Sequence, residues 1–348
     1  MRGVAIGDRG RQLGLLLVVV SVAWALTAAA APREWVVATV APEGSPTAAV
    51  VEEGIRLLER YAGATIRFRR RYGGVLGDEG DMLQSCRQGK IHLWAGSLGA
   101  LVTAVPELRF LEVPYLFRDV QAFQRVMAHY RRGRDPALQS LFARQGLVVF
   151  GMTAISWRNF SSVRRPIRTL SDLRGMTVRA QPGGLHPVYL SALGARPKAV
   201  SLNEINTALD VDLIDAFDIP ATFIYAGSLD SRIKHYTVTQ HILQIGVMVI
   251  HRQAWDSLPA TLRAAVEQAI EGIALRGELA HMAFDSEMIA LLPQRGVNVI
   301  QPTPEALADF RAAARKVEEH VRRTGSKEEI GLLDRVKKIV AEDGVNAR

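Results

Sequence analysis

The apolar positions of this chain switch repeatedly between the two-residue spacing of strands and the three-to-four-residue spacing of helices. Residues 35–40 form an apolar run typical of a strand, and helical spacing follows over residues 47–61. Alternation then predicts a strand over residues 64–70 and a helix over residues 78–88. Strands that alternate with helices predict an α/β fold, a mostly parallel sheet with helices on both faces.

The same alternation continues to the end of the chain. Further strands are predicted over residues 91–97, 147–152 and 242–250, and further helices over residues 120–130, 304–323 and 327–341. No proline interrupts residues 260–292, whose pattern predicts one unusually long helix. Gly272 and Gly277 are positions where that helix can bend.

The segment of residues 166–182 predicts a helical turn, with Thr169 as its N-cap, followed by a short strand that ends at a proline. Arg179 lies on one face of this strand with Thr177 and Gln181. A guanidinium group grips a carboxylate through two parallel hydrogen bonds, so Arg179 is a candidate ligand clamp. An arginine on a solvated strand face is the commoner case, and the spacing alone leaves both interpretations open.

The ends of several predicted strands define one candidate cleft, because open α/β sheets bind ligands beyond the carboxyl ends of their strands. We expect the loops after Val40, Ala95, Met152, Ala180 and Asp218 to surround it. The candidate residues in these loops include Ser97, Trp157, Arg158, Arg179 and Phe217.

Composition narrows the class of protein. The chain has 348 residues, of which 48% are hydrophobic and 22% charged, as in soluble globular proteins. Cys86 is the single cysteine, so no intrachain disulfide can form, and its helical apolar surroundings favour a buried, inert thiol. The net charge of +8 comes from scattered arginines, which favours an anionic ligand or a membrane surface over nucleic acid.

The N-terminus has the pattern of an export signal. Arg2, Arg9 and Arg11 precede an apolar run over residues 13–26, and small residues 27–31 predict cleavage near Ala30. An uncleaved anchor is the alternative interpretation. We therefore expect residues 1–30 to be removed and the mature protein to lie in the periplasm.

Catalytic motifs are missing from the sequence: it has no G-x-S-x-G, Walker or H-E-x-x-H pattern and no dinucleotide fingerprint. Asp210, Asp212, Asp215 and Asp218 lack the glycine turn and terminal glutamate of a calcium loop, so we interpret them as solvated carboxylates. These observations predict no enzyme, no metal and no cofactor.

A set of segments resembles the dicarboxylate-binding type of solute-binding protein from tripartite ATP-independent periplasmic (TRAP) transporters. The resemblance runs from Trp35 to about Gly325. It rests on APEGSP, GGVLGDEGDML, VPELRFLEVPYLF, RPIRTLSDLRGMTVRAQP, LGARPKAVSLNEINTALDVDLIDAFDIP and HRQAWDSLPATLRAAVEQA, in this order behind an export signal.

The resemblance implies a two-lobed periplasmic-binding-protein fold, type II-like, whose lobes share strands and a long helix that spans both. Lobe I would comprise residues 33–154 and 245–284, and lobe II residues 155–244 and 285–348. Such proteins capture an organic acid anion and deliver it to an ion-driven membrane permease. We expect a monomer, with a dimer as the alternative.

The same resemblance assigns roles to individual residues. Arg179 matches the arginine that clamps the ligand carboxylate, and Arg158, which follows Trp157, matches a second arginine donor. Phe217 and Ile219 stand where the family commonly has glutamine and asparagine. The further ligand-binding candidates are Asp218, Leu202, Tyr115 and Ser97.

The departures from the family pattern replace polar groups by apolar ones. Leu202 stands where an aromatic residue is common, and Phe217, Trp157 and Tyr115 would supply apolar or stacking walls. We therefore expect a carboxylate with an apolar or aromatic body, since apolar area supplies binding free energy where polar donors are lost.

Two other functions stay open at this point. One is an exported α/β enzyme that acts on an acidic substrate, using Asp215 or Asp218 with a histidine. The other is a sensor that uses the same cleft to signal to a membrane partner.

Overall fold

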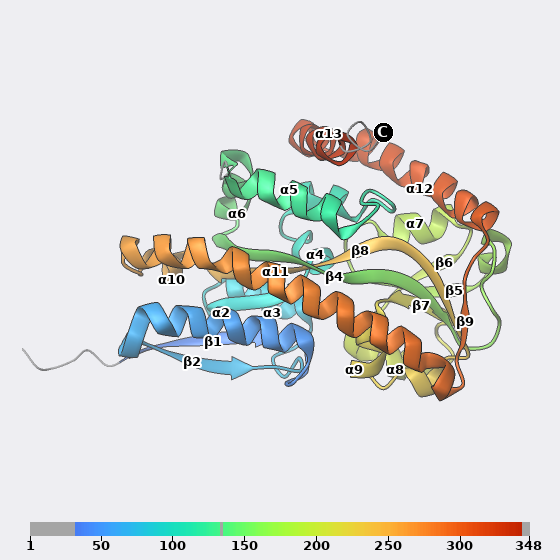
Figure 1. Cartoon of the computed structure of the whole chain (residues 1–348), viewed down its shortest axis with the longest axis horizontal. Coiled ribbons are helices and arrows are strands. Elements are labelled where there is room, and N and C mark those ends of the chain that lie inside the picture. The colour runs from blue at the N-terminus through green and yellow to red at the C-terminus, as the bar shows by residue number, and fades with distance from the viewer. Residues whose placement is uncertain (1–31, 133–134, 343–348) are drawn as a thin grey trace, which may run out of the picture.

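The computed structural model describes residues 32–132 and 135–342, and its strands form one mixed sheet (Figure 1). The strand order is β2-β1-β3-β8-β4-β7-β5-β6, with β9 beside β8. The strands are β1 (Arg33–Thr39), β2 (Ile66–Arg71), β3 (Leu93–Ser97), β4 (Leu147–Ser162), β5 (Thr177–Ala180), β6 (Arg196–Ala199), β7 (Ala216–Ile219), β8 (His235–His251) and β9 (Asn298–Ile300). The predicted export signal lies outside the described residues.

The long helices confirm the periodicity of the sequence, with ends shifted by a residue or two. They are α2 (Pro46–Ala62), α3 (Glu79–Arg87), α5 (Val120–Arg132), α11 (Ala260–Leu291), α12 (Pro304–Thr324) and α13 (Lys327–Ala341). Shorter helices are α4 (Leu98–Leu101), α6 (Pro136–Arg144), α7 (His186–Ala192), α8 (Ile205–Asp210), α9 (Ala221–Ala226) and α10 (Arg252–Asp256). The turn over Leu170–Leu173 begins with the expected cap, a capping box between Thr169 and Asp172.

The elements gather into two lobes on either side of the sheet centre (Figure 1). One lobe contains β1–β3 with α2 and α3, and the other contains β5–β7 with α8 and α9. The parallel strand pairs lie within the lobes, whereas β8 pairs antiparallel with both β3 and β4. Strands β4 and β8 run through both lobes, and α11 extends along both.

The two crossing strands are longer than predicted. The sequence predicted strands over residues 147–152 and 242–250. In the structure β4 extends to Ser162, and β8 already starts at His235. The prediction was wrong because the added stretch of β4 carries polar side chains, including Ser156, Arg158 and Asn159, that are nevertheless buried. Trp157 and Arg158 therefore lie inside a strand rather than in a loop.

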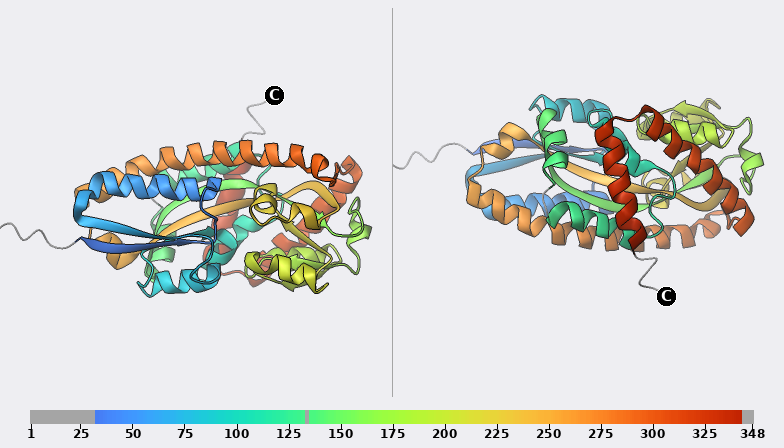
Figure 2. Two further views of the ribbon diagram at one scale, coloured as in Figure 1. Left: turned by 90° about the horizontal axis from the view of Figure 1, so that it is seen from below. Right: turned by 90° about the horizontal axis from the view of Figure 1, so that it is seen from above.

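The two last helices add another connection between the lobes. Helix α12 packs against α7, and α13 packs against α5 and the turn Pro106–Glu112 (Figure 2). The Nε of Arg109 donates to the buried Glu329 carboxylate at 2.8 Å. Helix α13, which the predicted boundaries assign to lobe II, thus contacts α5 of the predicted lobe I, and the boundaries themselves stay a prediction.

The single cysteine lies where the sequence predicted it. Cys86 is fully buried in the core beside Met82 and Leu83. Burial raises the pKa of its thiol to about 12, so the reactive thiolate is disfavoured at neutral pH.

A close helix contact fixes α11 on the first lobe. Helices α2 and α11 lie side by side (Figure 2), and Gly277 of α11 faces Val50 of α2. A Cβ atom on Gly277 would lie 2.7 Å from Cγ2 of Val50, closer than packed carbon atoms approach. Gly277 thus permits an approach of the two backbones that any other residue would prevent.

We expect Gly277→Ala to lower the free energy of unfolding by about 1–3 kcal/mol through overpacking against Val50. Gly272→Ala in the same helix is the matched control, because its Cβ would meet only the flexible end of Arg276. That control should be stabilising by up to about 1 kcal/mol, the usual helix preference of alanine over glycine. Urea unfolding of both variants measures the difference, and equal stabilisation would contradict the close packing.

Candidate functional site

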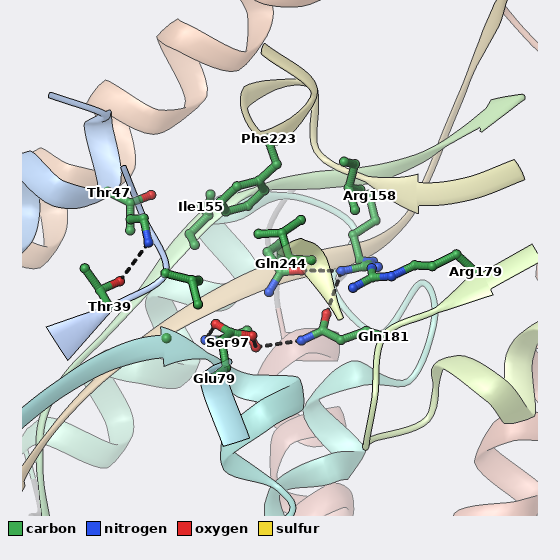
Figure 3. A pocket seen from close by; sticks show the side chains of 15 residues that line it. Thr39, Thr47, Glu79, Ser97, Ile155, Arg158, Arg179, Gln181, Phe223 and Gln244 are labelled. Atoms are coloured by element: carbon green, nitrogen blue, oxygen red, sulfur yellow. Dashed lines mark hydrogen bonds between the residues drawn. The ribbon is translucent and has the colours of Figure 1, made fainter. Parts of the chain in front are cut away.

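A small cavity lies between the two lobes where the strand ends converge. Its polar lining comes from both lobes, and its apolar lining from Ile155 of β4, Ile219 of β7, Phe223 of α9 and Leu202. Figure 3 shows Arg158 and Arg179 together on one side and Thr39 and Thr47 on the other. The polar and charged side chains of the lining are Thr39, Thr47, Glu79, Ser97, Gln181 and Gln244, with the two arginines.

The structure brings together five of the nine residues that the sequence nominated. Ser97, Arg158, Arg179, Leu202 and Ile219 line this cavity. Four of the predicted strand ends also converge there, and the exception is the loop expected after Met152, where β4 simply continues.

The other four nominated residues, Tyr115, Trp157, Phe217 and Asp218, are not among the residues that line it. Phe217 packs in the apolar core of the second lobe, and the partly buried Trp157 packs against the large core cluster that extends through both lobes. Tyr115 lies beneath the guanidinium of Arg311, 5.4 Å from its ring centre. Asp218 lies behind the cavity wall, where it faces Arg158.

Arg158 is the centre of a buried network (Figure 3). Its Nε and Nη2 each donate to the Asp218 carboxylate at 3.0 Å, and Nη2 also donates to the Asp218 carbonyl. Its Nη1 donates to the amide oxygens of Gln181 and Gln244. All three nitrogens therefore have protein partners, which does not fit the prediction that Arg158 donates directly to a ligand.

The Asp218 carboxylate is the negative charge at the bottom of this network. It is 1% exposed, so the interpretation of Asp218 as a solvated carboxylate was wrong. Burial opposes its ionisation, but the charge of Arg158 and a hydrogen bond with His241 outweigh burial and hold its pKa well below the usual range. Asp218 is therefore ionised at neutral pH and neutralises Arg158.

Arg179 has a different environment. It is 2% exposed, and its one hydrogen bond to the protein runs from Nε to the carbonyl of Val200 at 2.8 Å. Within the described part of the chain, its two terminal nitrogens have no partner. Burial, together with repulsion from Arg158, lowers the pKa of Arg179 to about 9. A buried guanidinium that lines a cavity with its terminal donors unused is a ready site for an anion.

Five polar lining residues were missed by the sequence prediction: Thr39, Thr47, Glu79, Gln181 and Gln244. Glu79 begins α3, and its carboxylate accepts from the backbone nitrogen and the hydroxyl of Ser97, both at 2.7 Å. Burial raises the pKa of Glu79 in spite of these hydrogen bonds. Gln181 and Gln244 carried usable signals, since Gln181 shares the strand face of Arg179 and Gln244 interrupts an apolar strand.

Gln181 also connects the two lobes. Its side-chain nitrogen donates to the Ser97 hydroxyl at 2.6 Å, while its oxygen accepts from Arg158. A continuous chain of hydrogen bonds therefore runs from Glu79 of the first lobe to Asp218 of the second.

The described residues, 32–132 and 135–342, lack two further features. Within these ranges no group of three or more His, Cys, Asp or Glu side chains is arranged to hold a metal ion. Nor does any described helix combine the length and apolar character needed to cross a bilayer.

Comparison with known proteins identifies the family. Residues 37–324 match the family described as bacterial extracellular solute-binding protein, family 7. The chain belongs to this family. It is a TRAP-type solute-binding protein, and its family and structural neighbours are binding proteins rather than enzymes.

Its relatives bind organic acids. The C4-dicarboxylate-binding periplasmic protein DctP of Rhodobacter capsulatus is 26% identical over 68% of each chain. The sialic acid-binding periplasmic protein SiaP of Vibrio cholerae is 22% identical over 74% of this chain and 78% of its own. A periplasmic location is typical of the family.

Solved structures of such proteins share the fold. A TRAP solute-binding protein from Sulfitobacter sp. NAS-14.1 with bound β-D-galacturonate has a TM-score of 0.81 at 20% identity, covering 88% of this chain and 100% of its own. One from Sulfurospirillum deleyianum with bound succinate has a TM-score of 0.79 at 18% identity, covering 89% and 99%. The two-lobed periplasmic-binding-protein fold, with a long helix spanning both lobes, is thus confirmed.

We expect Asp218→Asn to lower the free energy of unfolding by about 3–5 kcal/mol, because it leaves Arg158 as a buried charge without its counter-ion. Asp212→Asn is the matched control, since Asp212 pairs with Arg164 on the surface with both side chains largely exposed. The control should change stability little. Urea unfolding measures both, and similar small effects would show that the buried pair is not needed.

Proposed function

We propose that this solute-binding protein captures an organic acid anion in the cavity between its lobes, with Arg179 as the carboxylate clamp. The observation that carries the proposal is the buried guanidinium of Arg179, whose terminal nitrogens line the cavity and have no partner within the described residues. A carboxylate there would accept two parallel charge-assisted hydrogen bonds.

Arg158 has a positioning role in this proposal. It holds Gln181 and Gln244 in the cavity wall and places a positive charge near Arg179. Asp218 balances the charge of Arg158, so Arg179 supplies the net positive charge that favours an anion in the cavity. Phe217, Trp157 and Tyr115 support the site from the surrounding core.

The rest of the ligand is proposed to be largely apolar. Ile155, Leu202, Ile219 and Phe223 provide apolar surface beside the clamp. Glu79 lines the same cavity, so a second carboxylate near it would meet a like charge or require Glu79 to be protonated. Both observations favour a carboxylate with an apolar or aromatic body over a short dicarboxylate.

We further propose that the protein is exported by a signal cleaved near Ala30 and delivers its ligand to a TRAP-type, ion-driven membrane permease in the periplasm. Family membership and the N-terminal pattern of residues 2–31 support this part of the proposal.

We expect Arg179→Ala to weaken carboxylate binding by about 2–5 kcal/mol, as for other desolvated charge pairs. Lys198→Ala is the matched control, because Lys198 lies opposite Arg179 in the β5–β6 register and is exposed. Isothermal titration calorimetry with a bound acid measures both. Unchanged affinity in Arg179→Ala would overturn the clamp assignment.

A thermal-shift screen tests the class of ligand. We expect aromatic and aliphatic monocarboxylates to raise the melting temperature more than succinate or malate, since their apolar bodies cover the apolar wall. Uncharged amides of the same acids serve as controls and should have no effect. Stabilisation by C4-dicarboxylates alone would contradict the proposed ligand class.

A further inference from the structure

A ligand can reach Arg179 only when the lobes separate. Arg179 is 2% exposed, and Arg158 beside it is buried as well. The described arrangement therefore leaves a carboxylate from solvent almost no access to the terminal nitrogens of Arg179. Opening has to break the contacts that join the lobes next to the cavity, and hinge closure around a bound ligand has to remake them.

The loop of residues 181–186 makes these contacts against the first lobe, and we refer to them as the interlobe seam. Gln181 donates to the Ser97 hydroxyl at 2.6 Å. A Cβ atom on Gly183 would lie 2.6 Å from the carbonyl oxygen of Gly99, in helix α4 of the first lobe, so the two backbones are in close contact. The loop directly continues strand β5, which connects the seam to the strand that carries the proposed clamp.

The seam ends in an ion pair that is buried from water. His186, the first residue of α7, has its Nε2 atom 3.2 Å from Oε1 of Glu112, and the two side chains are 1% and 4% exposed. Glu112 ends the turn Pro106–Glu112, which packs on α4 of the first lobe. The pair thus joins the two lobes, and opening of the seam separates its partners.

Glycine at position 184 permits this pair. Gly184 has a φ of +64°, and a Cβ atom there would overlap Oε2 of Glu112. Oε2 itself is buried without a hydrogen-bond partner among the described residues. Within that part of the chain, His186 is the one side chain that hydrogen-bonds the Glu112 carboxylate, so this buried charge depends on it.

Charged groups from three neighbouring elements act on His186. Burial opposes protonation of its ring, as does the charge of Arg158 on β4. Glu112 and Asp218 of β7, whose Oδ2 lies 3.7 Å from Nδ1 of His186, outweigh both and raise the pKa of His186 above its ordinary value. The two carboxylates therefore favour the protonated ring when the seam is closed.

The other titratable side chains around α7 are mostly uncharged near neutral pH. Burial lowers the pKa of His241 on β8 and raises the pKa of Tyr189 on α7 well above its ordinary value. Burial also raises the pKa of Tyr115 to about 12, and Arg311 of α12 lies over the Tyr115 ring. Helix α12 packs against α7 and contributes apolar residues, including Phe310, to the core there. Glu112 and Asp218 are thus the anionic groups that favour a proton on His186.

We infer that His186 is a positioning residue that takes up a proton as the lobes close, so that capture of the ligand anion is coupled to protonation. In the open state His186 loses Glu112, one of its two anionic neighbours, and gains water. In the closed state the proton completes the pair across the seam. This inference rests on the proposed function, because closure follows binding at Arg179.

Protonation of His186 makes closure dependent on pH. The closed state holds the proton more tightly than the open state, so low pH favours closure. Ligand affinity should be greatest below the ordinary histidine pKa of 6.5 and should fall as the pH rises through the raised pKa of His186. The fall is about tenfold for each unit by which closure raises that pKa.

Calorimetric titration between pH 6 and pH 9, in buffers of different ionisation enthalpy, measures the protons taken up with each ligand. The probes are phenylacetate, hexanoate and succinate, and the acid that binds most tightly is used for the series. We expect the wild-type protein to take up a fraction of one proton per ligand, and His186→Gln to take up less. The difference isolates the share of His186 from that of Glu79 in the cavity. His129→Gln is the matched control, because His129 is exposed on α5.

A second variant breaks the pair without removing a titratable group. Gly184→Ala displaces the Glu112 carboxylate, so proton uptake should fall as in His186→Gln. Gly175→Ala is its matched control, because Gly175 has a similar φ of +73° but a Cβ atom there would meet nothing within 4 Å. Melting curves show whether each variant is folded, and the pH profile of the wild-type protein needs no variant.

The outcomes separate this inference from the proposed function. Affinity that falls with rising pH, together with proton uptake that decreases in His186→Gln and Gly184→Ala, supports the coupling. No uptake by the wild-type protein, or uptake unchanged in His186→Gln, overturns the coupling, and the clamp stands if Arg179→Ala still loses binding. Failure of all three acids to bind overturns both.

Discussion

Two guanidinium groups are buried side by side at one end of the cleft, and the protein neutralises only one of them. Asp218 and two glutamine side chains use every nitrogen of Arg158. The terminal nitrogens of Arg179 have no hydrogen-bond partner among the described residues. Burial and repulsion from Arg158 make its charge unfavourable and lower its pKa. In the proposed function, an incoming anion would neutralise the positive charge of Arg179, for which the described residues offer no direct hydrogen-bonded counter-ion. The surrounding strands, and the network that fixes Arg158, hold the positive charge of Arg179 in the cleft.

The fold explains how this arrangement is held. Strands β4 and β8 carry Arg158 and Gln244 from the middle of the sheet, where each strand is flanked by neighbours on both edges. Arg179 comes from the end of β5, and its neighbour Gln181 reaches across to Ser97 of the opposite lobe. The chain crosses between the lobes through β4, β8 and α11, and α12 and α13 add a further bridge at the surface. The site is built where these crossings meet.

Much of the fold was visible in the sequence, because helix and strand periodicities are local properties. Arg179 was nominated because its strand position and its flanking segments agreed, and the structure places it in the lining of the cavity. The role of Asp218 was not, because Asp218 and Arg158 are separated by 60 positions in the chain and only the fold brings them together. The full length of β4 was missed for the same reason, because sequence patterns do not reveal long-range pairing. The buried polar residues of β4 have the pattern of a loop. The absence of long-range information also led Phe217 and Trp157 to be assigned to the cleft, whereas each packs in or against a core.

The irregular pairing of β4 and β8 has a mechanical consequence. Their register shifts between Val149 and Gly151, between Ala154 and Ser156, and between Arg158 and Phe160. Bulges of this kind interrupt the ladder and let strands twist and bend. The last shift lies directly beside the arginine that organises the site, and there Gln240 adopts a positive φ of 47° while its backbone nitrogen donates to Asn159. The bend that these bulges permit therefore lies in the backbone that carries Arg158, whereas Arg179 comes from β5, outside this stretch. A substitution in β4 beside Arg158 would change both the strand pairing that joins the lobes and the hydrogen bonds that hold Gln181 and Gln244 in the cavity wall.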